Sequence, residues 1–306
     1  MAQQTFELLI LGSSAATPTS TRNPTAQLLN ITERLFLIDC GEGTQIQLRK
    51  YKTRFQNINH IFISHLHADH FLGLPGLIAS MNLLGRKNDL TIYAPKELEE
   101  IIQIIHRHSD SHLNFQLIFI QTQNKVKQKL WEDDKIEVYS IPLQHRVETT
   151  GFLFKEKPFP RSINKYKLEK MDVSFAEIHK LKQGLDAIDN KGQIIPNATL
   201  TVDPPLPRSY AFCSDTRFFE SLANDIKDVN LLYHESTFLE DKKERASQTF
   251  HSTAFQAAQM AILSSAKKLI LGHFSARYDD LNLFLEEALP IFKQTELAKE
   301  GTVFFV

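Results

Sequence analysis

The sequence SHLHADH at positions 64–70 contains three histidines and one aspartate, and it directly follows the apolar run 61–63, which is typical of a buried strand. His65, His67 and Asp69 are spaced two residues apart, so a helix cannot place them on one face, whereas a strand end running into a tight loop can. Imidazoles beside a carboxylate are typical metal ligands. The segment therefore predicts a metal site in a loop at the edge of a sheet; the alternative is a polar loop with incidental histidines.

The composition is that of an ordinary globular protein. The 306 residues are 42% hydrophobic and 23% charged, which suits one large domain or two modest ones. The formal net charge of -1 excludes a global attraction to nucleic acid or membranes, so a polyanionic partner must meet local patches. Two cysteines do not make a disulfide framework. The first residues lack a basic leader, and no apolar run approaches the roughly 20 residues that are needed to cross a bilayer. We therefore expect a cytoplasmic protein without a membrane partner.

Hydrophobic patterning predicts an α/β protein. The chain opens with strands expected over 6–11, 26–31 and 35–38, and later strands alternate with helices. Such alternation is typical of sheets covered by helices, an α/β sandwich. The later strands are expected at 60–64, 90–94, 136–141, 210–214, 231–234 and 269–272, and the helices at 72–84, 95–106, 218–226, 252–266 and 281–292.

Residues 155–203 interrupt this pattern and read as an insertion. Basic residues alternate with aromatic ones there, with little core-forming periodicity. A solvated surface is the simplest interpretation of an isolated basic stretch, and a linker to a separate domain is disfavoured because later residues supply polar groups that the first site needs. The basic residues that give the local cationic excess are Lys155, Lys157, Arg161, Lys165, Lys167, Lys170, Lys180 and Lys182.

Further candidate ligands follow predicted strands. His145, Asp215 and His273 each come after an apolar run, and strand ends are where α/β folds build sites. Each of these residues alone is more often a capped loop residue or a satisfied histidine. Their shared position after an apolar strand strengthens the prediction that all three are metal ligands. The combined set exceeds the needs of one tetrahedral zinc and suits two ions bridged by Asp215, with a hydroxide nucleophile between them. The set is His65, His67, Asp69, His70, His145, Asp215 and His273.

The tetrad HxHxDH, followed in order by the three later ligands, resembles the metallo-β-lactamase superfamily. The sequence also contains the blocks DCGEGTQ (39–45), HLHADHFLGL (65–74), HESTF (234–238), HST (251–253) and GHFSARY (272–278). Within the superfamily, these blocks closely resemble the ribonuclease Z family of tRNA 3′ processing endonucleases. The HEST and HST blocks separate that family from β-lactamases, glyoxalases and other hydrolases.

The resemblance implies a fold and a metal centre. The fold is an αββα sandwich formed by a single domain, 1–306, with an inserted tRNA-binding arm at 155–203. The centre contains two Zn²⁺ per subunit, with Mn²⁺ or another divalent ion tolerated by mixed nitrogen and oxygen ligands. One ion is held by His65, His67 and His145, the other by Asp69, His70 and His273, and Asp215 bridges them.

The resemblance also implies catalytic roles. Asp69 orients or deprotonates the attacking water, His251 protonates the leaving 3′ oxygen, and Glu235 fixes His251. Ser275 and Arg277 contact phosphate, a role that suits the planar guanidinium. The alternative for His251 is a structural residue at a helix N-terminus, ahead of a capping Ser or Thr.

The implied partners are precursor tRNA and a second copy of the chain. The arm grips the tRNA through phosphates and helix shape, and in a homodimer one subunit's arm presents tRNA to the other subunit's site. The family arm usually has a Gly-Pro pair near its tip, where this chain has residues 173–176, VSFA.

These observations predict a zinc-dependent endoribonuclease that removes the 3′ trailer from precursor tRNA, leaving a 3′ hydroxyl on the tRNA and a 5′ phosphate on the trailer. Two alternatives are open: a phosphodiesterase of the same superfamily acting on small phosphodiesters, and a metal-dependent RNA-binding protein without turnover. The second is disfavoured because a binding protein needs no separate acid at His251.

Overall fold

The chain forms two compact units. The computed structural model describes residues 4–109 and 112–306. One unit comprises the residues up to 131 together with 138–154 and 209–306, and the other comprises 132–137 and 155–208. No helix among the described residues is both long and apolar enough to span a bilayer.

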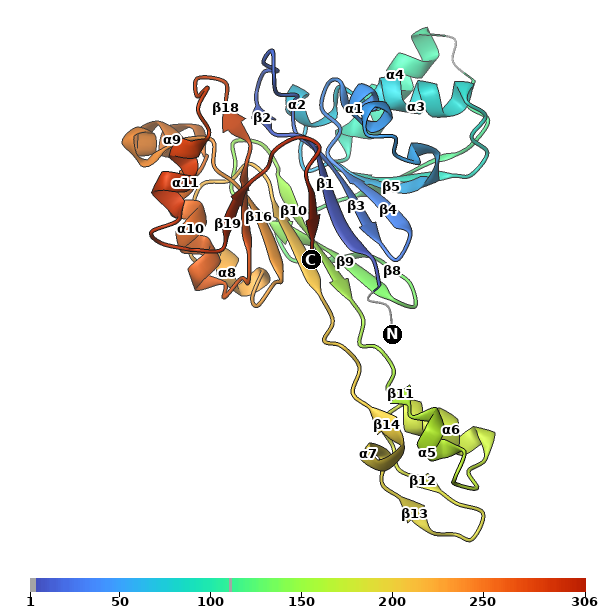
Figure 1. Cartoon of the computed structure of the whole chain (residues 1–306). Coiled ribbons are helices and arrows are strands. Elements are labelled where there is room, and N and C mark those ends of the chain that lie inside the picture. Colours follow the sequence, from blue (N-terminus) through green and yellow to red (C-terminus); the bar gives the residue numbers. More distant parts are fainter. Residues whose placement is uncertain (1–3, 110–111) are drawn as a thin grey trace. The chain divides into compact units, whose positions relative to one another are not determined.

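The first unit is built around two seven-stranded sheets (Figure 1). In the first sheet, β20, β1, β3 and β4 are antiparallel neighbours, and β4 to β7 run parallel. Its strands, in spatial order, are β20 (Val303–Phe305), β1 (Phe6–Gly12), β3 (Ala26–Ile31), β4 (Arg34–Ile38), β5 (Ile58–Phe62), β6 (Leu90–Ala94) and β7 (Leu117–Gln121).

The second sheet brings four parallel strands together. Strands β15, β16, β17 and β19 are parallel neighbours, so their carboxyl ends lie at one edge. The spatial order is β19 (Thr295–Leu297), β17 (Leu269–Gly272), β16 (Leu231–Glu235), β15 (Ser209–Cys213), β10 (Thr150–Glu156), β9 (Ile136–Pro142) and β8 (Lys129–Glu132).

Helices cover the outer faces of both sheets, which gives the αββα sandwich (Figure 1). The first sheet carries α1 (Thr44–Lys50), α2 (Ala68–Phe71), α3 (Leu74–Leu83) and α4 (Glu97–His108). The second carries α8 (Leu222–Asp225), α9 (Lys243–Thr249), α10 (Ala254–Leu263) and α11 (Asn282–Ala288). The shorter elements of this unit are β2 (Ser14–Ala15), β18 (Phe274–Ser275), η1 (Phe55–Asn57) and η2 (Glu240–Lys242).

Aromatic side chains fill the space between the sheets. The ring of Phe62 on β5 lies 5.2 Å from that of Phe152 and 5.3 Å from that of Phe154, both on β10. Phe36 on β4 lies 5.4 Å from Phe154, and all four side chains are buried. Because edge-to-face contacts add to the burial of large rings, this layer fixes the two sheets face to face.

Most of the predicted elements are present, with corrections at their ends. Helix α3 begins at Leu74 rather than at residue 72, with Pro75 in its first turn, where proline's missing N–H costs nothing. The prediction of a helix over 218–226 was wrong for its first half, because the helix begins only after Ser221. Asp69 and His70 lie on the single-turn helix α2 rather than in a loop.

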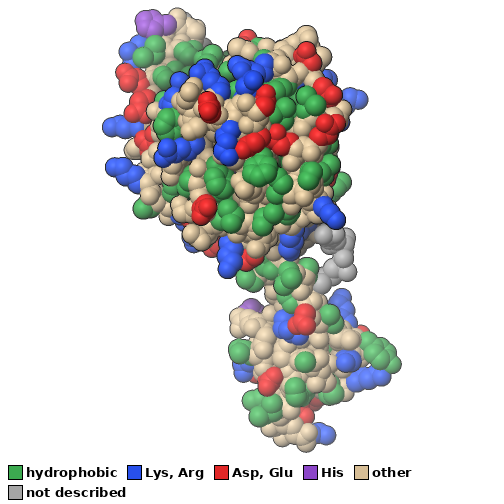
Figure 2. All heavy atoms as spheres, turned by 90° about the vertical axis from the view of Figure 1, so that its left-hand side faces the viewer, with side chains coloured by type: hydrophobic (Ala, Val, Ile, Leu, Met, Phe, Trp, Pro, Cys, Tyr) green, Lys and Arg blue, Asp and Glu red, His purple; other side chains and the backbone are tan. Residues whose placement is uncertain are grey.

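The second unit has its own small core, formed by Leu181, Ala187, Ile195 and Leu200. Asn197 stabilises it, since its Nδ2 donates to the carbonyls of Leu181 and Leu185 at 2.8 Å. The elements are α5 (Lys165–Leu168), α6 (Phe175–Lys182), α7 (Asn197–Leu200) and the paired strands β11 (Ser162–Ile163) with β14 (Thr201–Val202) and β12 (Ala187–Ile188) with β13 (Ile194–Ile195). Figure 2 shows both signs of charge interspersed on the visible face of each unit.

Candidate metal centre

Seven predicted ligands come from loops and short helices that follow strands of both sheets. His65 and His67 follow β5, and Asp69 and His70 lie on α2 directly afterwards. The other three follow strands of the second sheet: His145 after β9, Asp215 after β15 and His273 after β17. Their ligand atoms form two groups, one of His65, His67, His145 and Asp215 and the other of Asp69, His70 and His273.

The carboxylate of Asp215 faces both groups. Its Oδ2 lies 3.6 Å from Nε2 of His65 and 3.9 Å from Nε2 of His145. Its Oδ1 lies 3.5 Å from Nε2 of His70 and 3.1 Å from Nε2 of His273. One oxygen is therefore presented to each group, which is the arrangement that a bridging carboxylate requires.

The remaining contacts complete the two groups. Nδ1 of His67 lies 3.0 Å from Nε2 of His65 and 3.4 Å from Nε2 of His145. In the other group, Oδ2 of Asp69 lies 3.4 Å from Nε2 of His70 and 3.5 Å from Nε2 of His273. Each group thus converges on a space of the size that one ion needs.

The donor atoms fit divalent cations. Nε2 of His70, Nε2 of His273 and Oδ1 of Asp215 are buried without a hydrogen-bond partner among the described residues. Buried polar atoms are rarely left in that state, and a cation would satisfy all three. Nδ1 of His145 donates to the carbonyl of Phe250 at 2.8 Å, which leaves a lone pair on its Nε2 for a metal.

Burial also favours the ligand form of the histidines. Desolvation lowers the pKa of His65, His67 and His145, so these imidazoles are neutral near pH 7. Burial opposes the charged form of Asp215, but the neighbouring His273 and His70 outweigh it and hold the pKa of Asp215 well below its usual range. These three histidines therefore offer neutral nitrogens and Asp215 an ionised bridge. Burial opposes the charged form of His70, but Asp69, Asp215 and Asp39 outweigh it and raise the pKa of His70, so His70 loses a proton when a cation binds.

Asp39, which sequence reasoning did not single out, orients His70. Its Oδ2 accepts from Nδ1 of His70 at 2.7 Å, and its two oxygens also accept from the N–H and hydroxyl of Ser64 at 2.7 and 2.9 Å. Such a carboxylate fixes the tautomer of a metal-binding histidine and raises its basicity. The available signal was an aspartate directly after the apolar strand β4, the same context that marked Asp215.

Backbone contacts hold Asp69 in place. The N–H of Ala16 donates to Oδ2 of Asp69 at 2.7 Å. Gly41 packs so closely that an added Cβ would lie 2.4 Å from the carbonyl oxygen of Asp69. A glycine is therefore required at position 41, because a larger residue would displace the segment that carries Asp69 and His70.

His251 and Glu235 form a hydrogen-bonded pair beside the metal ligands. Nδ1 of His251 donates to Oε1 of Glu235 at 2.9 Å, and the His251 ring lies 5.0 Å from that of His145 and 5.5 Å from that of His273. Burial lowers the proton affinity of His251, but the charge and hydrogen bond of Glu235 outweigh it and raise the pKa of His251. The helix cap that follows is formed by Thr253 with Gln256, so His251 does lie ahead of a capping threonine, and its bond to Glu235 is additional to that position.

Thr237, also missed from the sequence, connects this pair to a metal ligand. Its hydroxyl donates to Oε2 of Glu235 at 2.8 Å and accepts from Nδ1 of His273 at 2.9 Å. Glu235 accepts three further bonds from the backbone N–H groups of Thr216, Ser252 and Thr237 at 3.1, 3.0 and 2.9 Å. The carboxylate of Glu235 is thus fixed on all sides, and with it the orientation of His251.

Ser275 and Arg277 lie on the loop after His273. The N–H of Ser275 donates to the carbonyl of Thr237 at 3.3 Å, and the guanidinium of Arg277 stands 5.3 Å from the ring centroid of Phe238. Arg22, which sequence reasoning also missed, supports this loop by donating to the carbonyls of Tyr278 and Ser275 at 2.8 and 3.3 Å.

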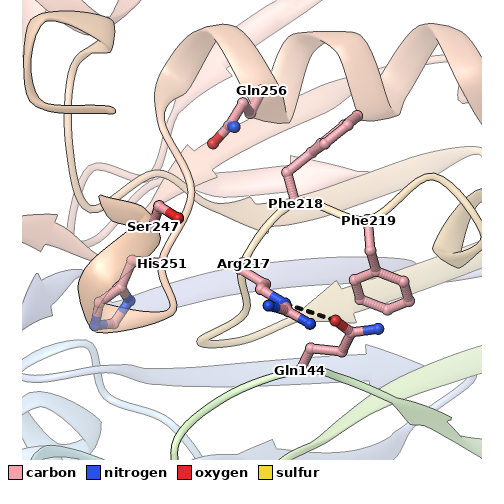
Figure 3. A pocket seen from close by; sticks show the side chains of 7 residues that line it. All are labelled: Gln144, Arg217, Phe218, Phe219, Ser247, His251 and Gln256. Atoms are coloured by element: carbon pink, nitrogen blue, oxygen red, sulfur yellow. Dashed lines mark hydrogen bonds between the residues drawn. The ribbon is translucent and has the colours of Figure 1, made fainter. Parts of the chain in front are cut away.

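A cavity of about 270 Å³ opens beside His251 (Figure 3). We call it the His251 pocket. Figure 3 shows Gln144, Arg217 and Phe219 gathered at one side of it and His251 with Ser247 at the other. Its lining residues are Gln144, Arg217, Phe218, Phe219, Ser247, His251 and Gln256.

Comparison with solved structures defines the class of protein. The structure matches human tRNase Z, short form, with a TM-score of 0.70 and 26% identity over 97% of this chain and 98% of that chain. It also matches the metallo-β-lactamase fold protein YhfI from Bacillus subtilis, with a TM-score of 0.69 and 16% identity over 99% of both chains, a likeness of fold alone. The protein therefore has the metallo-β-lactamase fold, as the resemblance implied.

Comparison with known sequences defines the family. A ribonuclease Z from Cytophaga hutchinsonii is 50% identical over 98% of this chain and 96% of that protein. One from Bacteroides thetaiotaomicron is 44% identical over 97% of this chain and 94% of that protein. Residues 6–177 also match the family model described as Anti-Pycsar protein Apyc1. The chain belongs to the ribonuclease Z family over nearly its full length, and residues 6–177 belong as well to the family that the Apyc1 model describes.

Asp39→Asn should weaken metal binding without unfolding the protein. An amide cannot offer His70 the charged acceptor that Asp39 does, and loss of such an outer partner costs roughly 10- to 100-fold in metal affinity. The measurement is the chelator concentration that removes half of the bound metal. Asp228→Asn is the matched control, because Asp228 is exposed and its φ of 58° suits asparagine. Equal metal retention by Asp39→Asn and Asp228→Asn would contradict the role of Asp39.

Proposed function

We propose that this protein is a metal-dependent endoribonuclease that removes the 3′ trailer from precursor tRNA, leaving a tRNA 3′ hydroxyl and a trailer 5′ phosphate. One observation carries the proposal: two ligand groups share the two oxygens of Asp215, with the His251–Glu235 pair beside them, in a chain of the ribonuclease Z family. Two Zn²⁺ ions are the proposed cofactor. His65, His67 and His145 would hold one, Asp69, His70 and His273 the other, and Asp215 both.

The bound ions would supply positive charge for the phosphate and lower the pKa of water to the neutral range. Asp69 accepts a hydrogen bond from the attacking water and orients it toward phosphorus, because its carboxylate is held by Ala16 and stays ionised. Burial opposes that ionisation, but the charge of His70 and the hydrogen bond from His273 outweigh burial and lower the pKa of Asp69.

His251 acts on the other side of the phosphate. The leaving 3′ oxygen of the tRNA needs a proton, and the raised pKa of His251 favours the charged imidazolium that can donate one. Since Nδ1 is bound to Glu235, Nε2 is the nitrogen that donates. Ser275 and the exposed Arg277 contact a phosphate of the RNA, and Arg22 positions their loop.

The second unit, which contains the predicted arm at 155–203, binds tRNA in this proposal. Its helix α5 and the following turn expose Lys165, Lys167 and Lys170, and Tyr166 is 70% exposed between them. On α6, Phe175 is 87% exposed. Cations beside exposed aromatic rings suit the phosphates and bases of RNA.

The protein acts as a homodimer in this proposal, with the arm of one subunit presenting tRNA to the site of the other. We propose a cytoplasmic location, which is supported by two buried thiols, Cys40 and Cys213, that form no disulfide among the described residues.

Incubation with a precursor tRNA, with and without a chelator, tests the activity. We expect one cut at the end of the acceptor stem, with a 3′ hydroxyl on the tRNA product, and loss of cleavage in the chelator that added Zn²⁺ or Mn²⁺ restores. Mapping of both product ends is the measurement. Turnover of a small aryl phosphodiester without any cleavage of precursor tRNA would favour the small-phosphodiester alternative and refute the proposal.

His251→Ala should retain bound metal and lose most cleavage. A general acid contributes about 10²- to 10⁴-fold in rate, so kcat should fall by a factor in that range. Single-turnover cleavage and metal content are the measurements. His108→Ala, at an exposed histidine of α4, is the matched control. Unchanged cleavage by His251→Ala would show that His251 has no part in the mechanism. His67→Ala, by contrast, changes a proposed metal ligand and should lower the metal content of the protein.

Replacement of Lys165, Lys167 and Lys170 by Gln should raise KM for precursor tRNA and weaken its salt dependence. Each phosphate contact contributes about 0.9 to the slope of log affinity against log salt, so the slope should decrease by about 2 to 3. Titration of binding between low and moderate salt measures it. The control replaces Lys87, Lys96 and Lys293, three exposed lysines of the first unit. Equal slopes for both variants would refute the tRNA-binding role of α5.

A further inference from the structure

The His251 pocket lies on the leaving-group side of the reaction. In an in-line displacement the attacking water and the leaving oxygen stand on opposite sides of phosphorus. His251 lies between the metal centre and the cavity. Its ring is 5.0 Å from that of His145 in the metal centre, and it also lines the cavity. With His251 as the proposed acid, the nucleoside that carries the leaving oxygen would lie on the cavity side of His251.

The pocket has the chemistry of a nucleobase site. Phe218 and Phe219 are half-buried in its lining, and single-stranded RNA ends are recognised by stacking their bases on aromatic rings and guanidinium planes. Its volume of about 270 Å³ lies below the roughly 300–1,000 Å³ of pockets that enclose drug-sized ligands. It therefore suits one nucleoside rather than a longer segment of RNA.

Arg217 is fixed in the pocket without a charge partner. Its Nε donates to Oε1 of Gln144 at 2.7 Å (Figure 3). Its guanidinium stands 5.1 Å from the ring centroid of Phe250. No carboxylate among the described residues forms an ion pair with Arg217. The exposed side chain is thus held in position while its terminal amino groups can donate to RNA oxygens.

We propose that the His251 pocket binds the last nucleotide retained by the tRNA, with Phe219 stacking on its base and Arg217 donating hydrogen bonds to the same nucleotide. This inference rests on the proposed function and adds the residues that position the leaving group. Stacking tolerates every base because each has an aromatic face. The pocket therefore fixes the position of the cut at an unpaired nucleotide without reading its sequence.

Two precursor tRNAs test the proposal, one natural and one with an abasic nucleotide at the last retained position. For the wild-type protein, we expect the abasic precursor to lower kcat/KM about tenfold. Phe219→Ala should lower kcat/KM for the natural precursor about tenfold and should lose nothing further with the abasic one, because both changes remove the same contact. If Phe219→Ala does not fold, Phe219→Leu takes its place, since leucine keeps the apolar bulk and lacks the aromatic face.

Two variants serve as controls. Phe219→Tyr retains an aromatic ring and should keep the full abasic penalty. Phe305→Ala changes a phenylalanine of β20 that is 70% exposed and should behave as the wild type. If the penalties of Phe219→Ala and of the abasic nucleotide multiply, Phe219 does not stack on that base and the proposal is wrong. A third precursor, abasic at the first nucleotide of the trailer, is the substrate control. The proposal is equally wrong if Phe219→Ala is coupled only to that trailer-side change. Failure of the proposed function gives a different result, because the wild type would then cleave none of the precursors.

Discussion

The shared carboxylate of Asp215 is the interaction on which the rest of the site depends. Its oxygens face two groups of ligands, each of which combines residues that follow strands of both sheets, and its side chain is almost wholly buried. A buried anion is costly unless positive charge or hydrogen-bond donors compensate for it. His273 and His70 compensate part of this cost, but Oδ1 has no hydrogen-bond partner among the described residues. Two cations would compensate both oxygens at once.

The αββα architecture brings these groups together. His65 to His70 follow a strand of the first sheet, whereas Asp215 and His273 follow strands of the second, and the aromatic layer between the sheets fixes their separation. Parallel strands are essential for this, because their carboxyl ends share one edge. Replacement of Phe62, Phe152 or Phe154 by a small residue would therefore disturb the metal centre without changing a ligand.

The sequence was sufficient to predict the strands that precede the ligands and the α/β class, because period and strand-end context are local properties. It was not sufficient for Asp39 and Thr237, since each acquires its role only from a partner on another element. Arg22 illustrates the same limit: it contacts a loop some 250 residues away, with a chain separation of 253 to Ser275. The helix expected over 218–226 was shortened because Phe218 and Phe219 line the pocket instead of a helix face.

The His251 pocket and the metal centre are formed by the same short backbone segments. Gln144 precedes His145, Arg217 follows Asp215 by two residues, and the N–H of Arg217 donates to the carbonyl of Gln144 at 3.0 Å. Phe250 joins them as well, since its carbonyl accepts from His145 while its ring lies against Arg217. A nucleotide that presses on this wall would therefore act on the same short segments that position two ligands. Because these segments are hydrogen-bonded to each other, a substitution in the wall of the His251 pocket would also act on the segments that carry His145 and Asp215.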